Sequence, residues 1–424
     1  FRYDAKNPHS LSSNFVRACC EDNLGNIWIG TFNGLNRYNK STGLFQNHTA
    51  NDIQTDGLTH SSIWCIVKDN QGTLWLGTYF GGVNYFNPEY EIYTRYSYSS
   101  NEKKGLSNPV VGRTIEDKNG NLWIGTEGGG LNYYNRRTRE FKWYRPQEGR
   151  NSISHNNVKA LYYDADKEII WIGTHLGGLN KLDIRSGHFT HYRMEGNNPQ
   201  SLPSDIIRDI TPYKDLLIIA TQNGVCLFNP ANGQCRQLFK DSKEGKSIKM
   251  VADVVFDSEG TLWIAATGEG VFSYRFDTRK LTNYRHDAAN PNSLSNNNVN
   301  NITQDSKGNL WFSTSGSGLD LYRPETNDFE NFDKGKNGLA SDCIYETQES
   351  PTSGKLLLIT NEGFSIFDYR NKDFNNYSAE NGFPLTAVNE NALCVTRDGE
   401  IFLGGVQGMI SFHEMELNFT PKPY

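Results

Sequence analysis

Short apolar runs alternate with polar, glycine-containing turns along the whole chain, without the spacing of an amphipathic helix. In the clearest segment, Asp117–Tyr134 (DKNGNLWIGTEGGGLNYY), the apolar run Leu122–Ile124 is typical of a strand. The preceding Asp117–Gly120 predicts a tight turn, because Asp can hydrogen-bond its own backbone and Gly tolerates a positive φ. A second turn at Glu127–Gly130 and a second strand at Leu131–Tyr134 complete a predicted β-hairpin.

This hairpin occurs nine times along the chain. The tryptophan position of the successive copies is occupied by Trp28, Trp75, Trp123, Trp171, Ile218, Trp263, Trp311, Leu357 and Phe402. Successive members of this series are 45 to 48 residues apart. A fixed period of this size is typical of a solenoid, a propeller or another repeat array.

Two further strands are predicted in each repeat. A Val-x-x-Ile pattern precedes the Asp turn, as at Val299–Gln304, and a short aromatic segment follows the hairpin, as at Leu281–Tyr284. Four short antiparallel strands per repeat of about 47 residues are the pattern of a β-propeller blade. We therefore predict an all-β fold, a β-propeller of nine four-stranded blade repeats, with no helix longer than two turns. The tryptophan position is predicted to be buried between blades.

The ends of the pattern leave two ways to close the ring. Phe1–Tyr3 is predicted to be an outermost strand, which can complete the last repeat and close one ring of nine. Alternatively, Glu91–Tyr96 closes a ring of seven, and the first two blades belong to a preceding propeller. Propellers typically have four to eight blades. In the second alternative, residues 1–97 hold two blades, residues 98–412 hold seven, and residues 413–424 are a linker.

Composition excludes several functional classes. The 424 residues carry a net charge of -6 with acidic and basic residues interspersed, so no basic face for nucleic acid is expected. No apolar stretch approaches the roughly 18 residues of a membrane span. The seven cysteines lack metal-binding spacing, and most are expected to be buried thiols. Cys226 and Cys235 flank a turn, however, and can instead form a disulfide across a hairpin.

No motif for a catalytic nucleophile, a metalloprotease or a phosphate-binding loop occurs in the sequence. A glycosidase would need paired carboxylates that converge on a sugar. The candidate acids are Asp209, Asp253, Glu127 and Glu269. The candidates for a lyase are His155, His175 and Arg113. The repeated Asp is interpreted as a turn-forming residue. We predict no catalytic residue, no metal and no cofactor, with a glycan-cleaving propeller enzyme as the alternative.

The positions that vary most between repeats indicate where a ligand binds. They follow the threonine of the hairpin's first strand, or lie within the strand before the Asp turn. Variable loop tips on a rigid scaffold are where binding residues are expected. The predicted ligand-binding residues are Trp64, Tyr79, Phe80, Arg113, Glu127, His175, Arg208 and Asp209.

These residues offer two kinds of contact, each with a structural alternative. The aromatic side chains at 64, 79 and 80 can stack on a sugar, or they can plug the channel. Arg113 and Arg208 suit a sulfate or a uronate group through bidentate hydrogen bonds, or they form ion pairs between blades. A scaffold that binds protein partners at its rim is a third functional class.

The repeat D-x-x-G-x-L-W-I-G-T-x-x-G-G-L-N-x-Y resembles the propeller repeat of two-component regulators. A linker of the form NP-x-SLS, as at Asn7–Ser12, is also similar to that of the family. The resemblance covers Phe1 to about Phe412. The nearly complete copies are those at Trp28, Trp75, Trp123, Trp171 and Trp311. In this family the repeats form the extracytoplasmic sensor region of hybrid histidine-kinase systems that detect oligosaccharides.

The resemblance implies two seven-bladed propellers followed by a β-sandwich, a membrane helix and cytoplasmic kinase parts, so this chain would hold the last nine of fourteen blades. It implies a periplasmic, non-enzymatic sensor that binds an oligosaccharide and controls polysaccharide-utilisation genes through a kinase outside this chain. A homodimer of the parent receptor is expected. Membrane attachment would come only from parent segments outside this sequence, and this chain is expected to bind no nucleic acid.

Overall fold

The computed structural model describes residues 1–7, 9–40, 43–50, 57–88, 92–378, 383–385 and 387–418. The described chain is almost entirely strands and turns, which confirms the all-β prediction. Its described helices are α1 (Lys334–Asn337) and the 3-10 helices η2 (Glu102–Lys104), η3 (Gly245–Ser247) and η5 (Glu414–Asn418). None of the helices in these ranges is long and apolar enough to cross a membrane. The chain forms two compact units, Phe1–Ile92 with Met415–Tyr424, and Tyr93–Glu414.

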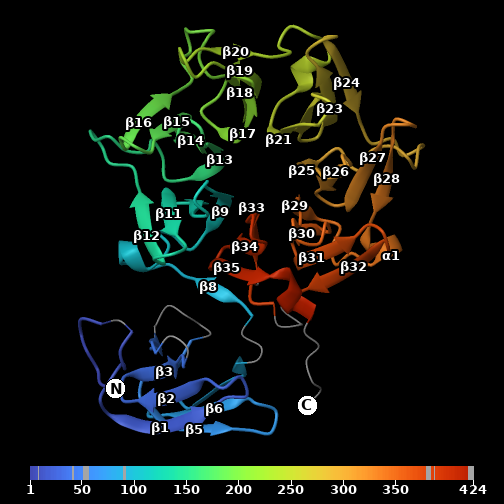
Figure 1. Cartoon of the computed structure of the whole chain (residues 1–424). Coiled ribbons are helices and arrows are strands. Elements are labelled where there is room, and N and C mark those ends of the chain that lie inside the picture. Colours follow the sequence, from blue (N-terminus) through green and yellow to red (C-terminus); the bar gives the residue numbers. More distant parts are fainter. Residues whose placement is uncertain are drawn as a thin grey trace. The chain divides into compact units, whose positions relative to one another are not determined.

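The larger unit is a ring of seven four-stranded antiparallel blades (Figure 1). Blade 1 holds β9 (Val111–Glu116), β10 (Leu122–Thr126), β11 (Leu131–Asn135) and β12 (Glu140–Tyr144). Blade 2 holds β13 (Val158–Asp164), β14 (Ile169–Thr174), β15 (Leu179–Asp183) and β16 (His188–Tyr192). Blade 3 holds β17 (Ile207–Tyr213), β18 (Leu216–Thr221), β19 (Gly224–Phe228) and β20 (Cys235–Gln237).

The remaining blades continue the same order around the axis. Blade 4 holds β21 (Val251–Phe256), β22 (Leu262–Ala266), β23 (Gly270–Arg275) and β24 (Lys280–Tyr284). Blade 5 holds β25 (Val299–Gln304), β26 (Leu310–Thr314), β27 (Leu319–Arg323) and β28 (Asp328–Phe332). Blade 6 holds β29 (Ile344–Glu349), β30 (Leu356–Thr360), β31 (Gly363–Asp368) and β32 (Asp373–Tyr377). Blade 7 holds β33 (Val388–Val395), β34 (Glu400–Gly405), β35 (Gly408–His413) and β8 (Thr94–Tyr96).

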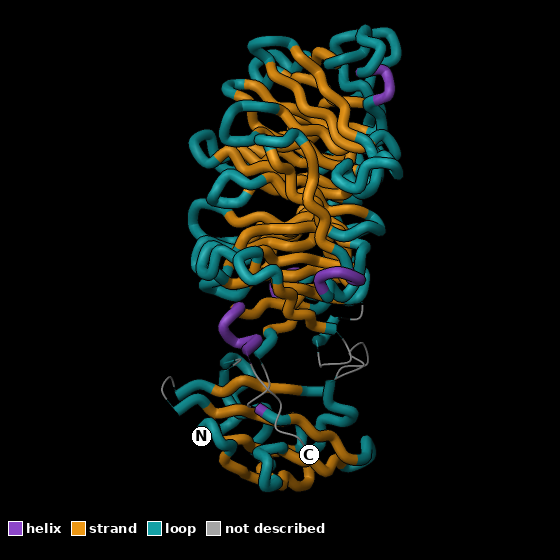
Figure 2. Tube along the Cα trace, turned by 90° about the vertical axis from the view of Figure 1, so that its right-hand side faces the viewer, coloured by secondary structure: helices purple, strands orange, loops and turns teal. Residues whose placement is uncertain are grey.

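The ring is closed by β8, which comes from the start of the unit and pairs with β35 near its end. Tyr96 lies opposite Met409, and Thr94 lies opposite Ser411. The structure therefore has the ring of seven, and Phe1–Tyr3 forms no strand that would close a ring of nine. The unit begins at Tyr93 rather than at the predicted residue 98, because β8 belongs to blade 7. Figure 2 shows the ring edge-on, with connecting loops along both faces.

The smaller unit contains two blades. Its first sheet holds β1 (Val16–Glu21), β2 (Ile27–Thr31), β3 (Gly34–Tyr38) and β4 (Phe45–His48). Its second sheet holds β5 (Ile63–Lys68), β6 (Leu74–Thr78) and β7 (Val83–Phe86). This second sheet has three strands among the described residues, one fewer than predicted. The two sheets share a core of Trp28, Leu35, Ile63, Leu74 and Leu76.

The repeated aspartate ties the hairpin turn to the core between blades. Oδ1 of Asp305 accepts hydrogen bonds from the backbone N–H groups of Lys307 and Asn309, at 3.0 and 2.9 Å. Its Oδ2 accepts the indole N–H of Trp311 at 3.0 Å. The same pair of interactions recurs at Asp22–Trp28, Asp69–Trp75 and Asp257–Trp263. The turn-forming role is confirmed, and the carboxylate also satisfies the tryptophan N–H.

Most tryptophan positions are buried between blades, as predicted. Trp171, for example, packs on Leu217, Ile219 and Phe228 of the next blade. Trp75 is the exception, because it is 42% exposed and stacks on Tyr85 of its own sheet. No described sheet of the two-blade unit covers that face of β5–β7.

Candidate ligand-binding site at the axis of the ring

The innermost strand of each blade carries a β-bulge or register shift near its start. In β13 the pairing shifts from Val158 opposite Thr174 to Ala160 opposite Gly173, which leaves Lys159 as the extra residue. The equivalent shifts leave Arg208, Ala252, Asn300 and Tyr345 as the extra residues of β17, β21, β25 and β29. Bulges re-aim side chains and are common beside functional sites.

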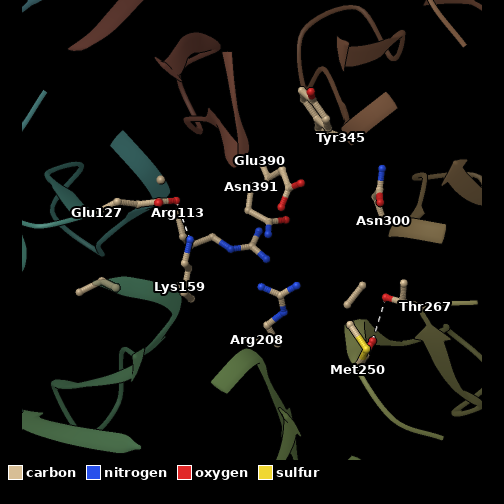
Figure 3. Close-up of a pocket in the computed structure, with 13 residues that line it drawn as sticks. Arg113, Glu127, Lys159, Arg208, Met250, Thr267, Asn300, Tyr345, Glu390 and Asn391 are labelled. Atoms are coloured by element: carbon tan, nitrogen blue, oxygen red, sulfur yellow. Dashed lines mark hydrogen bonds and ion pairs between the residues drawn. The ribbon is translucent and has the colours of Figure 1, made fainter. Parts of the chain in front are cut away.

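These extra residues line a cavity of about 190 Å³ on the axis of the ring (Figure 3). The full lining is Gly112, Arg113, Glu127, Val158, Lys159, Arg208, Met250, Ala252, Thr267, Asn300, Tyr345, Glu390 and Asn391. All seven innermost strands contribute to it. Pockets that enclose whole small molecules typically measure roughly 300–1,000 Å³, so this cavity admits one substituent or one small ring of a larger ligand.

Arg113 is held in a buried charge cluster. Its Nη1 lies 3.2 Å from Oε1 of Glu346, and its Nη2 lies 3.4 Å from Oδ1 of Asp209. The side chains of Arg113 and Glu346 are only 14% and 1% exposed. Burial by itself lowers the pKa of Arg113, but the carboxylates of Glu346 and Asp209 raise that pKa above its ordinary value. Arg113 therefore forms the inter-blade ion pairs that were the structural alternative.

The same register position joins consecutive blades through backbone hydrogen bonds. Oδ2 of Asp253 accepts the N–H of Ile302 at 2.7 Å. In the next blades, the Asn301 side chain accepts the N–H of Thr347 at 2.9 Å, and Glu346 accepts that of Leu393 at 3.0 Å. Three of the polar residues on innermost strands are thus structural.

Among these structural residues, the pKa of Asp253 is raised into the neutral range. Burial and the neighbouring Asp209 carboxylate raise the pKa of Asp253 to about 7, against the opposing effect of Arg113. Burial also raises the pKa of Glu346, although Arg113 lowers it in part. The cluster contains three carboxylates and one guanidinium, which accounts for the tendency of one carboxylate to keep its proton.

Arg208 differs from Arg113, because its side chain has no hydrogen bond or ion pair with any residue that the structure describes. Its half-buried side chain extends into the cavity, as Figure 3 shows. Lys159, by contrast, lies 2.6 Å from Oε1 of Glu127. Burial raises the pKa of Glu127, but the hydrogen bond and charge of Lys159 bring it below its ordinary value.

His175 lies within electrostatic reach of this group. Burial, followed by the charge of Lys159, lowers the pKa of His175, so its imidazole tends to be neutral. Its buried Nδ1 has no hydrogen-bond partner in the described part of the chain. Of the predicted residues in the ring, Arg113, Glu127 and Arg208 line the cavity. Asp209 pairs with Arg113, and His175 lies outside the lining.

The three predicted aromatic residues gather in the two-blade unit. Trp64 stacks on Tyr79 with ring centroids 5.6 Å apart, and Tyr79 contacts Phe80 at 4.2 Å. The guanidinium of Arg17 lies 4.3 Å from the Trp64 ring. All three aromatic side chains are exposed, Phe80 at 79%. Three of the eight predicted residues therefore belong to the two-blade unit, and the other five belong to the ring.

Several lining residues were not among the predicted ligand-binding residues. Tyr345 follows Ile344 as Arg208 follows Ile207, so the repeat register alone could have identified it. Glu390 and Asn391 lie in a longer irregularity, where pairing shifts from Val388 to Leu393, and no repeat signal marks them. Of the candidate acids, Glu269 pairs with Arg285, and it is not part of the lining.

Comparison with known proteins identifies the repeat. The model of the two component regulator propeller matches residues 10–33, 57–80, 105–128, 152–175 and 293–316. No curated protein matches the chain. The extracellular domain of the hybrid two component system BT3049 from B. thetaiotaomicron is similar, with a TM-score of 0.74 and 25% identity over 96% of this chain and 57% of that one.

Two other solved structures share the fold. The extracellular domain of BT4673 from the same organism has a TM-score of 0.62 and 21% identity over 98% of this chain and 54% of that one. Virginiamycin B lyase from Staphylococcus aureus has a TM-score of 0.56 and 11% identity over 76% of this chain and 98% of that one. This chain thus spans little more than half the length of the two B. thetaiotaomicron domains.

Proposed function

Because this chain carries two-component regulator propeller repeats, we propose that it is the ligand-binding sensor module of a hybrid two-component system. The similarity to the extracellular domain of such a system supports this assignment and a location outside the cytoplasm, which we propose to be the periplasm. We propose an oligosaccharide as the ligand. A kinase outside this sequence would then control polysaccharide-utilisation genes, within a homodimeric receptor.

The axial cavity is the observation that carries the proposal. The blade scaffold repeats the same four strands, whereas the bulged position holds Lys159, Arg208, Asn300 or Tyr345. A rigid frame that presents different side chains to one cavity is suited to recognition. In the two-blade unit the same register position holds Trp64, whose exposed ring offers a stacking surface for a sugar.

The carboxylates favour binding over cleavage. A glycosidase needs one acid and one second carboxylate on either side of the scissile bond. Among the described residues, Glu127 is paired with Lys159, and Asp209 is paired with Arg113. The oxygens of Asp253 and Glu346 accept backbone N–H groups of the following blade. These acids are engaged in holding the ring together.

Signal transmission places a thermodynamic condition on the ligand. A ligand shifts an equilibrium between two receptor arrangements only by its difference in affinity for them. We therefore expect this chain to bind the oligosaccharide, and the parent receptor to bind it more tightly in one arrangement than in the other.

The proposal is tested by titration calorimetry with oligosaccharides released from plant and host polysaccharides. Chromatography of each sample after the titration reports whether the sugar is intact. Binding heat with intact sugar is the expected result. If the sugar is shortened, the chain is a glycan-cleaving enzyme and the sensor proposal is wrong. If no glycan binds, the proposal that the ligand is an oligosaccharide is wrong.

A further inference from the structure

The charged side chains of the axial cavity are unevenly compensated. Its lining contains Arg113, Lys159, Arg208, Glu127 and Glu390. Arg113 is neutralised by Glu346 and Asp209, and Lys159 is neutralised by Glu127. Arg208 is the cation of the described lining that lacks an acceptor. Its neighbour in the chain, Asp209, is already directed to Arg113.

We propose that the axial cavity binds an acidic sugar through a carboxylate or sulfate seated on the guanidinium of Arg208. This inference rests on the proposed function and names the chemical class of the ligand. A guanidinium presents parallel N–H donors that match the two oxygens of a carboxylate or a sulfate. In Figure 3 the side chains of Arg208 and Arg113 both extend into the cavity, which Glu390 also lines, so an anion there would pair with Arg208, the cation that has no carboxylate partner among the described residues.

Arg113 adds a second, independent indication. Its Nε is buried and has no hydrogen-bond partner among the described residues, although its two terminal nitrogens are paired. An unsatisfied buried donor costs free energy unless a further acceptor reaches it. Arg113 is held rigidly by Glu346 and Asp209, so it contributes a fixed hydrogen-bond donor beside Arg208 and no uncompensated charge.

The size of the cavity restricts what part of the ligand enters. A volume of about 190 Å³ accepts an acidic substituent, or one sugar ring, and leaves the rest of an oligosaccharide outside. A neutral sugar in the same place would displace water from Arg208 without supplying an anionic acceptor. Loss of that hydration without a replacement is unfavourable. The cavity therefore selects acidic over neutral sugars.

The test uses three small probes on the whole chain. Glucuronate supplies a carboxylate, glucose 6-sulfate supplies a sulfate, and glucose is the neutral control. Binding is followed by ligand-observed NMR titration at low and at high salt. We expect at least one acidic probe to bind ten-fold or more tightly than glucose, with an affinity that falls as salt rises.

Arg208→Gln should abolish the preference for the acidic probe while the melting temperature remains that of the parent. Arg208→Lys should restore only part of it, because an ammonium lacks the planar pair of donors. Arg236→Gln is the matched control, since Arg236 is exposed on β20 and lies outside the cavity lining. This control removes the same charge and should bind all probes as the parent does.

The outcomes separate this inference from the proposed function. If neutral oligosaccharides bind the chain and the acidic probes bind no better than glucose, the sensor stands and the acidic site is wrong. Equal binding of the acidic probe by the parent and Arg208→Gln also overturns the inference. If an acidic probe binds through Arg208 but no oligosaccharide binds, the acidic site is supported and the proposal of an oligosaccharide ligand is wrong. If nothing binds, both fall.

Discussion

At the scale of single residues, the tryptophans on the second strands of blades 1, 2, 4 and 5 carry much of the packing. Trp123 is 1% exposed, and it packs with Ile170 and Ile172 of the next blade. Unlike Trp311, whose indole donates to Asp305, Trp123 has a buried Nε1 with no hydrogen-bond partner among the described residues. Comparing Trp123 with Trp311 therefore separates the contribution of apolar packing to stability from that of the indole hydrogen bond.

We predict that Trp123→Ala lowers the free energy of unfolding by about 3–5 kcal/mol, as truncation of a buried aromatic side chain does. Trp123→Phe should cost less than Trp311→Phe by roughly 1 kcal/mol, because only the second change removes a formed hydrogen bond. Urea unfolding followed by tryptophan fluorescence measures both. A loss below about 1 kcal/mol for Trp123→Ala would show that this face is not packed between blades.

Asp253 makes stability depend on pH. Its pKa in the folded ring is about 7, above the ordinary value of 3.8, because of burial and of the facing Asp209. Arg113 and Asn301 also face it. The folded state therefore holds more protons than the unfolded chain between about pH 4 and pH 7. Over this window the contribution of Asp253 falls as pH rises, by at most roughly 1.4 kcal/mol per pH unit.

Asp253→Asn keeps an oxygen to accept the N–H of Ile302 and removes the charge that faces Asp209. We predict that the variant matches the parent below about pH 4, where the carboxyl is largely protonated in both states, and is more stable by roughly 1–3 kcal/mol at pH 8. Unfolding curves of both proteins across this range measure the difference. A difference that does not change with pH would mean that Asp253 is ionised throughout.

At the scale of elements, the hairpins and strands could largely be predicted, because most blades repeat the turn, tryptophan and glycine signals at a nearly constant spacing. Two elements could not. Phe1–Tyr3 resembles an outer strand in sequence but forms none, since β8 occupies the edge of β35. The bulges are also invisible to the pattern, because an extra residue changes the register without changing the spacing of apolar residues.

The disulfide between Cys226 and Cys235 fixes one hairpin of blade 3. The sequence allowed two alternatives for this pair, buried free thiols or a disulfide. In the structure the two cysteines form a disulfide between β19 and β20. They are nine residues apart in the chain. In the chain-entropy treatment, a cross-link that closes a loop of that size lowers the conformational entropy of the unfolded chain. This stabilises the folded state by about 2–3 kcal/mol.

We predict that reduction with dithiothreitol lowers the stability of the ring by about 2–3 kcal/mol. The Cys226→Ala/Cys235→Ala variant should lose a similar amount and should no longer respond to reductant. Thermal unfolding with and without the reductant reports this change. Identical curves for oxidised and reduced parent protein would contradict a stabilising disulfide.

At the scale of the whole molecule, the ring decides which polar residues are structural and which face a ligand. The sequence marked Arg113 and Arg208 as equivalent candidates. Their roles differ in the structure, because Glu346 and Asp209, which come from other blades, form ion pairs with Arg113. Such contacts join residues 96 and 233 positions apart, and no local pattern reports them. The division of the predicted residues between two units likewise depends on where the ring closes.

The central claim, that ligand binds at the axis of the ring, is tested most directly by hydrogen–deuterium exchange with a bound oligosaccharide. Peptides that contain the starts of β13, β17 and β29, near Lys159, Arg208 and Tyr345, should exchange more slowly with ligand than without it. Peptides from the outer strands β16, β20 and β32 should not change. Protection confined to those outer strands, or to neither set, would contradict a ligand site at the axis.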